Sequence, residues 1–265
     1  MIRRHPSLSY FVLAYTISWL GAFLVASPYW LRGEAVPKMA GLMMFPAMLL
    51  GPSIAGIALT AATRGKAGLR NLVLRLCRLG SYAWFATLLV PPALVLAVLL
   101  GLKTFVSPAF KPNLFWIGFL FGCGAGLFEE IGWTGFAFST MRVRQDAMRA
   151  GISLGLLWAL WHVPVIDYLG SATPHGSYWF PFLLAFTVAM TAIRMLICWI
   201  YVNTDSLLLA QMFHASSTGA LAAFSPSSVA AGEETMWYSV YGIVLWTLVA
   251  GILARFGPTL GRAKR

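Results

Sequence analysis

The chain has 265 residues, of which 59% are hydrophobic and only 10% are charged, whereas a soluble domain carries roughly a quarter charged residues. So few polar side chains cannot cover a water-facing surface, which excludes a soluble globular protein and a disordered chain and predicts a polytopic membrane protein. The net charge of +11 does not indicate a nucleic-acid partner, because the basic residues stand at the ends of apolar segments.

Apolar stretches recur along the whole chain, each close to the length of about 20 residues that a spanning helix needs. They predict an all-α membrane protein with eight spans, at 8–27, 40–62, 82–102, 114–139, 151–168, 179–201, 206–223 and 236–256. Between the second and third spans, 66–79 is expected to form an amphipathic helix lying in the membrane interface. Its apolar face would carry Leu69, Leu72, Val73 and Leu76, with Arg70, Arg75 and Arg78 lying off that face.

The basic residues predict how these spans are oriented. With the N-terminus in the cytoplasm, fifteen of the 19 Lys and Arg residues fall inside or toward the inside. The four that fall outside are Arg32, Lys38, Lys103 and Lys111. This bias follows the positive-inside rule and favours an even number of spans with both termini cytoplasmic. A plasma (inner) membrane protein is expected.

Ionisable residues within membrane spans are costly and point to function. They are few in this chain and stand on the fourth to seventh spans: Glu129, Glu130, His162, Arg194 and His214. Counted from the cytoplasmic ends, they lie roughly 10–17 Å deep in a core of about 30 Å. We therefore expect these side chains to face one another around a wet cavity among four helices.

A carboxylate with two histidines suits two kinds of chemistry. Glu129 could take a proton from water, with one histidine sharing the work and the other stabilising an oxyanion. Alternatively, Glu129, His162 and His214 could bind Zn²⁺ and leave a position for water. Adjacent glutamates on a helix point about 100° apart, so Glu130 is expected to pair with a cation instead.

The same residues carry a family resemblance. The segment 129–135 reads EEIGWTG, Trp158 precedes His162 by four residues, and His214 precedes Thr218 by four. This pattern resembles the motifs of the CPBP intramembrane metalloprotease family, which includes CAAX prenyl proteases and bacteriocin-processing, Abi-like members. The resemblance divides the chain into 1–112, with three spans and the interfacial helix 66–79, a protease core at 113–222, and 223–265, with the last span and a basic tail.

The resemblance implies a catalytic role for Glu129, Glu130, His162, His214 and Thr218. Glu129 would activate water with His162, while His214 and Thr218 would bind the oxyanion; a metal-independent mechanism stays open. The chain departs from the family at Thr134, where Arg is usual, and at Thr218, where Asn is common. We expect Arg194 to supply the missing cation beside Glu130.

The predicted function is intramembrane hydrolysis of a peptide bond in a CAAX-type prenylated protein, a peptide or another membrane protein, with the lipid bilayer as the other partner. Two alternatives remain: a non-catalytic membrane immunity or scaffold relative, and a proton-coupled transporter. The absence of an internal inverted repeat weighs against the transporter. Trp133 and Trp158 are expected to be packing or lipid-facing rings, and Gly122 and Gly126 to mark close helix packing.

Overall fold

The computed structural model describes residues 2–261, and helices of several lengths make up most of that range. The basic tail residues Arg262, Lys264 and Arg265 lie outside the described residues. The α-helices are α1 (Pro6–Trp30), α2 (Lys38–Leu76), α3 (Val90–Phe105), α4 (Gly118–Gly132), α5 (Ser139–Met141), α6 (Ala147–Trp161), α7 (Trp179–Thr204), α8 (Leu207–Phe224) and α9 (Ala231–Phe256). A π-helix, η3 (Trp133–Phe138), joins α4 to α5.

Helices occupy all eight predicted stretches, but two of them are less regular than expected. The fourth passes from α4 through the π-helical turn of η3 into α5. The fifth, α6, has only 15 residues and ends at Trp161, after which 163–168 forms a 3₁₀-helix, η4 (Val163–Tyr168). Pro164 lies in this segment, and a proline ring cannot continue an α-helix without kinking or breaking it.

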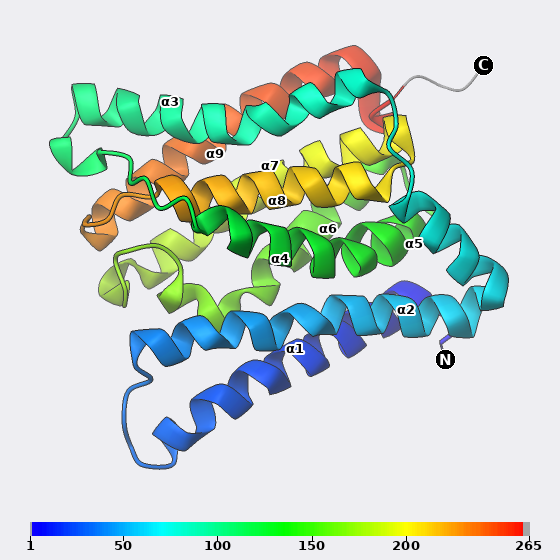
Figure 1. The fold of residues 1–265 in the computed structure, drawn as a ribbon, viewed down its shortest axis with the longest axis horizontal. Coiled ribbons are helices and arrows are strands. Elements are labelled where there is room, and N and C mark those ends of the chain that lie inside the picture. Colours follow the sequence, from blue (N-terminus) through cyan, green and yellow to red (C-terminus); the bar gives the residue numbers. More distant parts are fainter. Residues whose placement is uncertain (1, 262–265) are drawn as a thin grey trace.

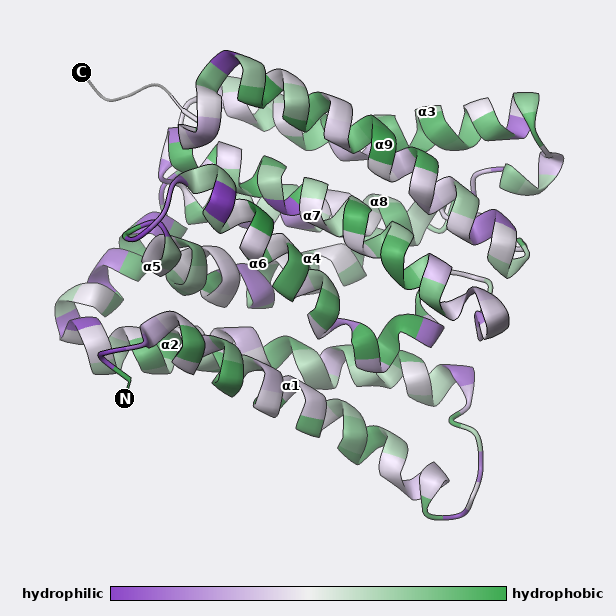
Figure 2. Ribbon diagram, turned by 180° about the vertical axis from the view of Figure 1, so that it is seen from behind, coloured by the Kyte–Doolittle hydropathy of each residue, from purple (hydrophilic) through white to green (hydrophobic). Residues whose placement is uncertain are grey.

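Six helices among the described residues are long and apolar enough to cross a membrane. They are Pro6–Trp30, Lys38–Leu76, Tyr82–Phe105, Gly176–Thr204, Leu207–Phe224 and Ala231–Thr259. Hydrophobic residues follow the shafts of the helices and hydrophilic ones gather toward their ends (Figure 2). Large apolar side chains on several helices face outward, including Leu24, Leu120 and Ile243. The chain is a multi-pass membrane protein.

The helices form a bundle with α4 near its centre (Figure 1). Helix α4 packs against α8 on one side and α2 on the other, and α2 pairs with α1. Helix α7 packs against both α6 and α9, while α3 lies against α8 and α9. The first described residues, α5 and the end of α9 lie at one end of the bundle (Figure 1); we call it the basic end, because Arg3, Arg4, Arg142, Arg144 and Arg255 are at or near it.

Helix α2 bends before the segment predicted to be interfacial. Gly65 has a φ of 62° and a ψ of −158°, a conformation that glycine adopts without the steric cost of a Cβ. Beyond it, the helix continues to Leu76, so the predicted helix ends three residues early. The expected face is wrong in two places: Arg75 is buried, whereas Val73 is 56% exposed. Arg75 turns inward because it donates to the Tyr201 hydroxyl and to Ser139.

Glycines hold α4 close to α8, as the sequence predicted. A Cβ at Gly122 would lie within 3 Å of the backbone of Ala215 and Gly219, and one at Gly126 would meet the Gln211 carbonyl. A side chain at either position would therefore push the two helices apart. Gly126 lies one turn before Glu130, so this close approach brings the Glu130 carboxylate within reach of α8.

Candidate active site

Glu130 lies at the centre of a buried network of charged side chains. Its Oε2 accepts from Arg194 Nη1 at 2.8 Å and from the Thr134 hydroxyl, and its Oε1 lies 2.7 Å from His214 Nδ1. Glu130 and Arg194 are fully buried, and His214 is 1% exposed. Arg194 therefore occupies the position predicted for it, as the cation beside Glu130, and Thr134 adds a hydrogen bond.

Two tryptophans hold the other carboxylate. Glu129 Oε2 accepts from the indole Nε1 of Trp158 at 2.7 Å and from that of Trp133 at 3.1 Å. Both rings are buried, as expected of packing residues, and in addition both donate to Glu129, which the sequence did not predict. No group among residues 2–261 donates a hydrogen bond to Glu129 Oε1, so this oxygen is left for a water molecule or a substrate.

His162 caps the C-terminal end of α6. Its Nδ1 lies 2.9 Å from the Trp158 carbonyl oxygen. Because a carbonyl only accepts, Nδ1 carries the hydrogen, and in the neutral ring Nε2 is then the free acceptor. His214 differs in the charge of its partner: its Nδ1 faces the Glu130 carboxylate instead of a neutral carbonyl, which again leaves Nε2 to address a reacting group. The two histidines are thus prepared for different tasks.

The Trp158 ring connects these groups. Its centroid lies 5.6 Å from that of His162 and 5.0 Å from that of His214, both in edge-to-face geometry. The Arg194 guanidinium carbon lies 4.2 Å from the ring centroid on its face, a cation–π distance. One side chain therefore contacts Glu129, both histidines and Arg194. The position of Trp158 in the motif, four residues before His162, was the signal that could have identified it as a site residue.

The site is more closed than the predicted wet cavity. Glu129 is 3% exposed and His162 8%, and the rings of Trp161 and Phe186 pack against His162. Thr218 lies one helical turn beyond His214 on α8 and is half-buried; among the described residues its hydroxyl makes no hydrogen bond. The four helices do bring their polar groups together at one level, but in this structure these groups pack against one another.

The π-helix η3 directly follows the last turn of α4, which carries Glu129 and Glu130. Residues 133–138 are all buried, and they include both Trp133, which donates to Glu129, and Thr134, which donates to Glu130. A π-turn widens the helix locally and is frequent at functional sites. Each donor follows its carboxylate by four residues, the spacing at which side chains meet on one face of a helix.

Replacing Trp158 by phenylalanine should lower the free energy of unfolding by about 1.5–3 kcal/mol, the contribution of a hydrogen bond to a charged group. Phenylalanine keeps a ring beside the histidines but cannot donate to Glu129. Trp161→Phe is the matched control, since the Trp161 indole nitrogen is buried with no hydrogen-bond partner. Melting temperatures in detergent would be compared for the two variants and the native chain. Equal losses would show that ring packing, rather than the donor, matters.

The structure bears on metal binding through the positions of its donors. Among residues 2–261, no group of three His, Cys, Asp or Glu side chains is placed to hold a metal ion. The Nδ1 atoms of both histidines and one oxygen of Glu129 already have partners within the protein. These contacts leave Nε2 of each histidine and Oε1 of Glu129 without a partner in the described part of the chain, and metal-ligating histidines commonly use their other ring nitrogen in this way. A zinc requirement stays a prediction.

Comparisons with known proteins agree with the motifs. Residues 111–220 match the family model described as type II CAAX prenyl endopeptidase Rce1-like. The CAAX prenyl protease 2 of Methanococcus maripaludis is 28% identical to this chain over 225 residues, which cover 78% of the chain and 79% of the relative. The matched segment contains Glu129, Glu130, His162, His214 and Thr218. Residues 111–220, which hold these side chains, are thus similar to CAAX-type prenyl endopeptidases.

Proposed function

We propose that this chain is an intramembrane endopeptidase in which Glu129 and His162 activate the attacking water. One observation carries the proposal: two indoles fix one oxygen of the Glu129 carboxylate, and the other oxygen has no partner in the described protein. A carboxylate held in this way can accept a proton in a defined direction. The free Nε2 of neutral His162 would accept a hydrogen bond from the same water.

Peptide hydrolysis would proceed through a tetrahedral intermediate. The water oxygen bonds to the scissile carbonyl carbon, and the water proton passes to Glu129. The carbonyl oxygen becomes an oxyanion, which His214 Nε2–H and the Thr218 hydroxyl would stabilise. Collapse of this intermediate breaks the C–N bond, and Glu129 returns the proton to the leaving amine. The products are a new carboxyl terminus and a new amino terminus.

Charge balance supports the role of His214. Glu130 is paired with Arg194, so a carboxylate faces His214 Nδ1 and requires a hydrogen there. For Nε2 also to donate to an oxyanion, the ring must be the imidazolium. With His214 positive, the two glutamates and the two cations sum to zero, which suits a buried site. Glu130 thus orients His214 in the way a buried aspartate orients the histidine of a serine protease triad.

The proposed substrate is a prenylated protein ending in a CAAX sequence. This substrate class is taken from the similarity to the Methanococcus relative, a CAAX prenyl protease. A prenyl chain would hold such a substrate in the bilayer, where this site lies. Peptides and the termini of other membrane proteins are the broader class. We place the protein in the plasma membrane with both termini cytoplasmic, on the bias of its basic residues.

The test compares peptides and new protein termini in cells that express the native chain or the Glu129→Gln variant at matched levels. Termini absent from the variant would establish catalysis and identify the substrate. A farnesylated CAAX peptide added to purified protein would test the substrate class by release of its last three residues. Identical terminal profiles would favour the non-catalytic membrane relative. Treatment with a chelator, then zinc, would test the metal requirement separately.

A further inference from the structure

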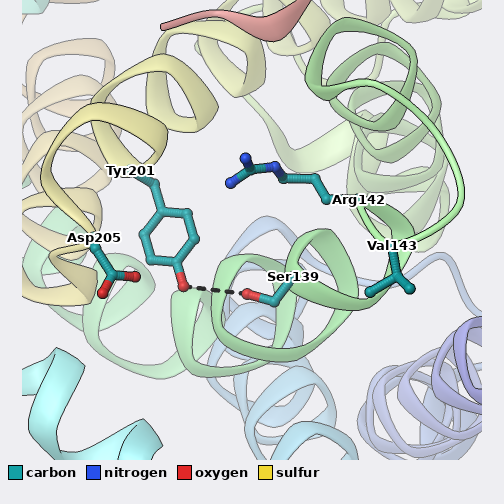
Figure 3. A pocket seen from close by; sticks show the side chains of 5 residues that line it. All are labelled: Ser139, Arg142, Val143, Tyr201 and Asp205. Atoms are coloured by element: carbon teal, nitrogen blue, oxygen red, sulfur yellow. Dashed lines mark hydrogen bonds between the residues drawn. The ribbon is translucent and has the colours of Figure 1, made fainter. Parts of the chain in front are cut away.

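A polar pocket opens at the basic end of the bundle. It lies away from the polar cluster, the name used here for Glu129, Glu130, His162, Arg194 and His214. It has a volume of about 250 Å³ and is lined by Ser139, Arg142, Val143, Tyr201 and Asp205 (Figure 3). These residues come from α5, the turn that follows it and the C-terminal end of α7. The Arg142 guanidinium reaches across the pocket toward the Tyr201 ring (Figure 3).

The hydrogen bonds around the pocket leave only some of its donors free. Ser139 donates its hydroxyl hydrogen to the Thr134 carbonyl at 3.1 Å, so Tyr201, 3.1 Å away, must donate to Ser139. Arg75 in turn donates to both hydroxyls. The hydroxyl hydrogens are therefore already used within the protein. Among the described residues, Arg142 makes no hydrogen bond or ion pair, and its guanidinium remains available to a ligand.

The charges around the pocket favour an anion. Asp205 lines it, but this carboxylate is paired with Arg78 at 2.7 Å, and that pair sums to zero. Two positive charges remain near the pocket. One is on Arg75, which is bonded to the two hydroxyls, and the other is on Arg142 in the lining. Neither faces a carboxylate of its own within hydrogen-bond distance. Arginine presents a planar fork of donors that matches the oxygens of a phosphate.

The surroundings favour a lipid over a soluble anion. Val143 lines the pocket and is 81% exposed, an apolar side chain between two arginines at the end of the spanning bundle. Such an arrangement suits a glycerol or acyl contact beside a headgroup, and basic pockets between membrane helices bind anionic headgroups. We propose that this pocket binds the phosphate of an anionic phospholipid through Arg142, with Arg75 adding its charge from below.

The pocket is joined to the polar cluster by hydrogen bonds. Tyr201 bonds to Ser139, Ser139 donates to the Thr134 carbonyl, and the Thr134 hydroxyl donates to Glu130. A phosphate bound by Arg142 would therefore lie beside residues whose hydrogen bonds lead to Glu130. The binding of the lipid does not rest on the proposed function.

Native mass spectrometry of the full chain can test the binding directly. The protein is exchanged into nanodiscs containing equal amounts of phosphatidylglycerol and phosphatidylcholine, and the lipid retained on release is counted. Arg142→Gln should lower retained phosphatidylglycerol about tenfold, the effect of losing one hydrogen bond to a charged group. Arg144→Gln is the matched control, because Arg144 is exposed two residues away and does not line the pocket. Retention of phosphatidylcholine should not change in either variant.

Equal losses in both variants would overturn the proposal, since they would indicate general attraction to a basic surface. So would unchanged retention in Arg142→Gln. A separate arm adds inorganic phosphate to delipidated protein and follows thermal stability. Stabilisation by phosphate that depends on Arg142, without selective retention of phosphatidylglycerol, would identify a free anion as the ligand and overturn the lipid assignment. Because no cleavage is measured, these results stand whether or not the chain is a protease.

Discussion

Glu129→Gln should lower the rate of peptide hydrolysis by about 10²–10⁴-fold, the range expected when a general base is removed, while leaving the fold intact. Glutamine keeps a carbonyl oxygen that can accept from Trp133 and Trp158, so the indole contacts survive. Its amide group cannot take a proton from water. The rate on a cleaved peptide and the melting temperature in detergent would be measured together.

Glu34→Gln provides the control for loss of a carboxylate. Glu34 pairs with Arg32 on the surface, where both side chains are about half exposed, and exposed pairs contribute little to stability. Its substitution should leave both the rate and the melting temperature unchanged. A Glu129→Gln protein that retains the native rate would contradict the role of Glu129 as base and return the function to the non-catalytic alternative.

Arg194→Met should cause the largest loss of stability of any single substitution in the polar cluster. Arg194 donates to Glu130 at 2.8 Å, and both side chains are fully buried. Removing one partner of a buried pair leaves an uncompensated charge, which costs about 3–5 kcal/mol. Methionine fills similar space, so the effect can be assigned to charge. The melting temperature in detergent should fall sharply, and expression should decrease.

The double variant Glu130→Gln/Arg194→Met separates charge from packing. It removes both members of the pair and leaves a neutral amide that can still accept from Thr134. It should therefore recover most of the lost melting temperature, yet remain impaired in hydrolysis, because His214 loses the carboxylate that orients it. Native stability in Arg194→Met alone would refute the charge pairing, and a double variant no more stable than the single one would show that Arg194 acts through packing.

Much of the site could be predicted because polar groups inside a membrane are rare. Glu129, Glu130, His162, Arg194 and His214 interrupt otherwise apolar spans, and a charged group in hydrocarbon needs a partner. Depth along each helix then placed them at one level. The pairing of Arg194 with Glu130 was predicted from the family resemblance together with its depth, because Thr134 stands where the family usually has Arg.

The roles of the tryptophans could not be predicted in this way. An indole is equally suited to packing, to the membrane interface and to donating a hydrogen bond. Whether Trp158 faces lipid or Glu129 depends on the rotation of α6 relative to α4, which sequence spacing does not specify. Arg75 is a similar case: its helix was predicted, but its inward turn depends on Tyr201, a residue 126 positions away.

The sequence alone determined that the chain spans a membrane, that its structure is helical and which spans carry the polar groups, because these depend on hydrophobicity and local periodicity. The tertiary structure decided how the groups pair. It assigned Arg194, Thr134 and His214 to one carboxylate and Trp133 and Trp158 to the other, and it closed the expected cavity with aromatic rings. The contacts between helices depend on helix rotation and on the glycine contacts between α4 and α8, which arise only when distant segments pack together.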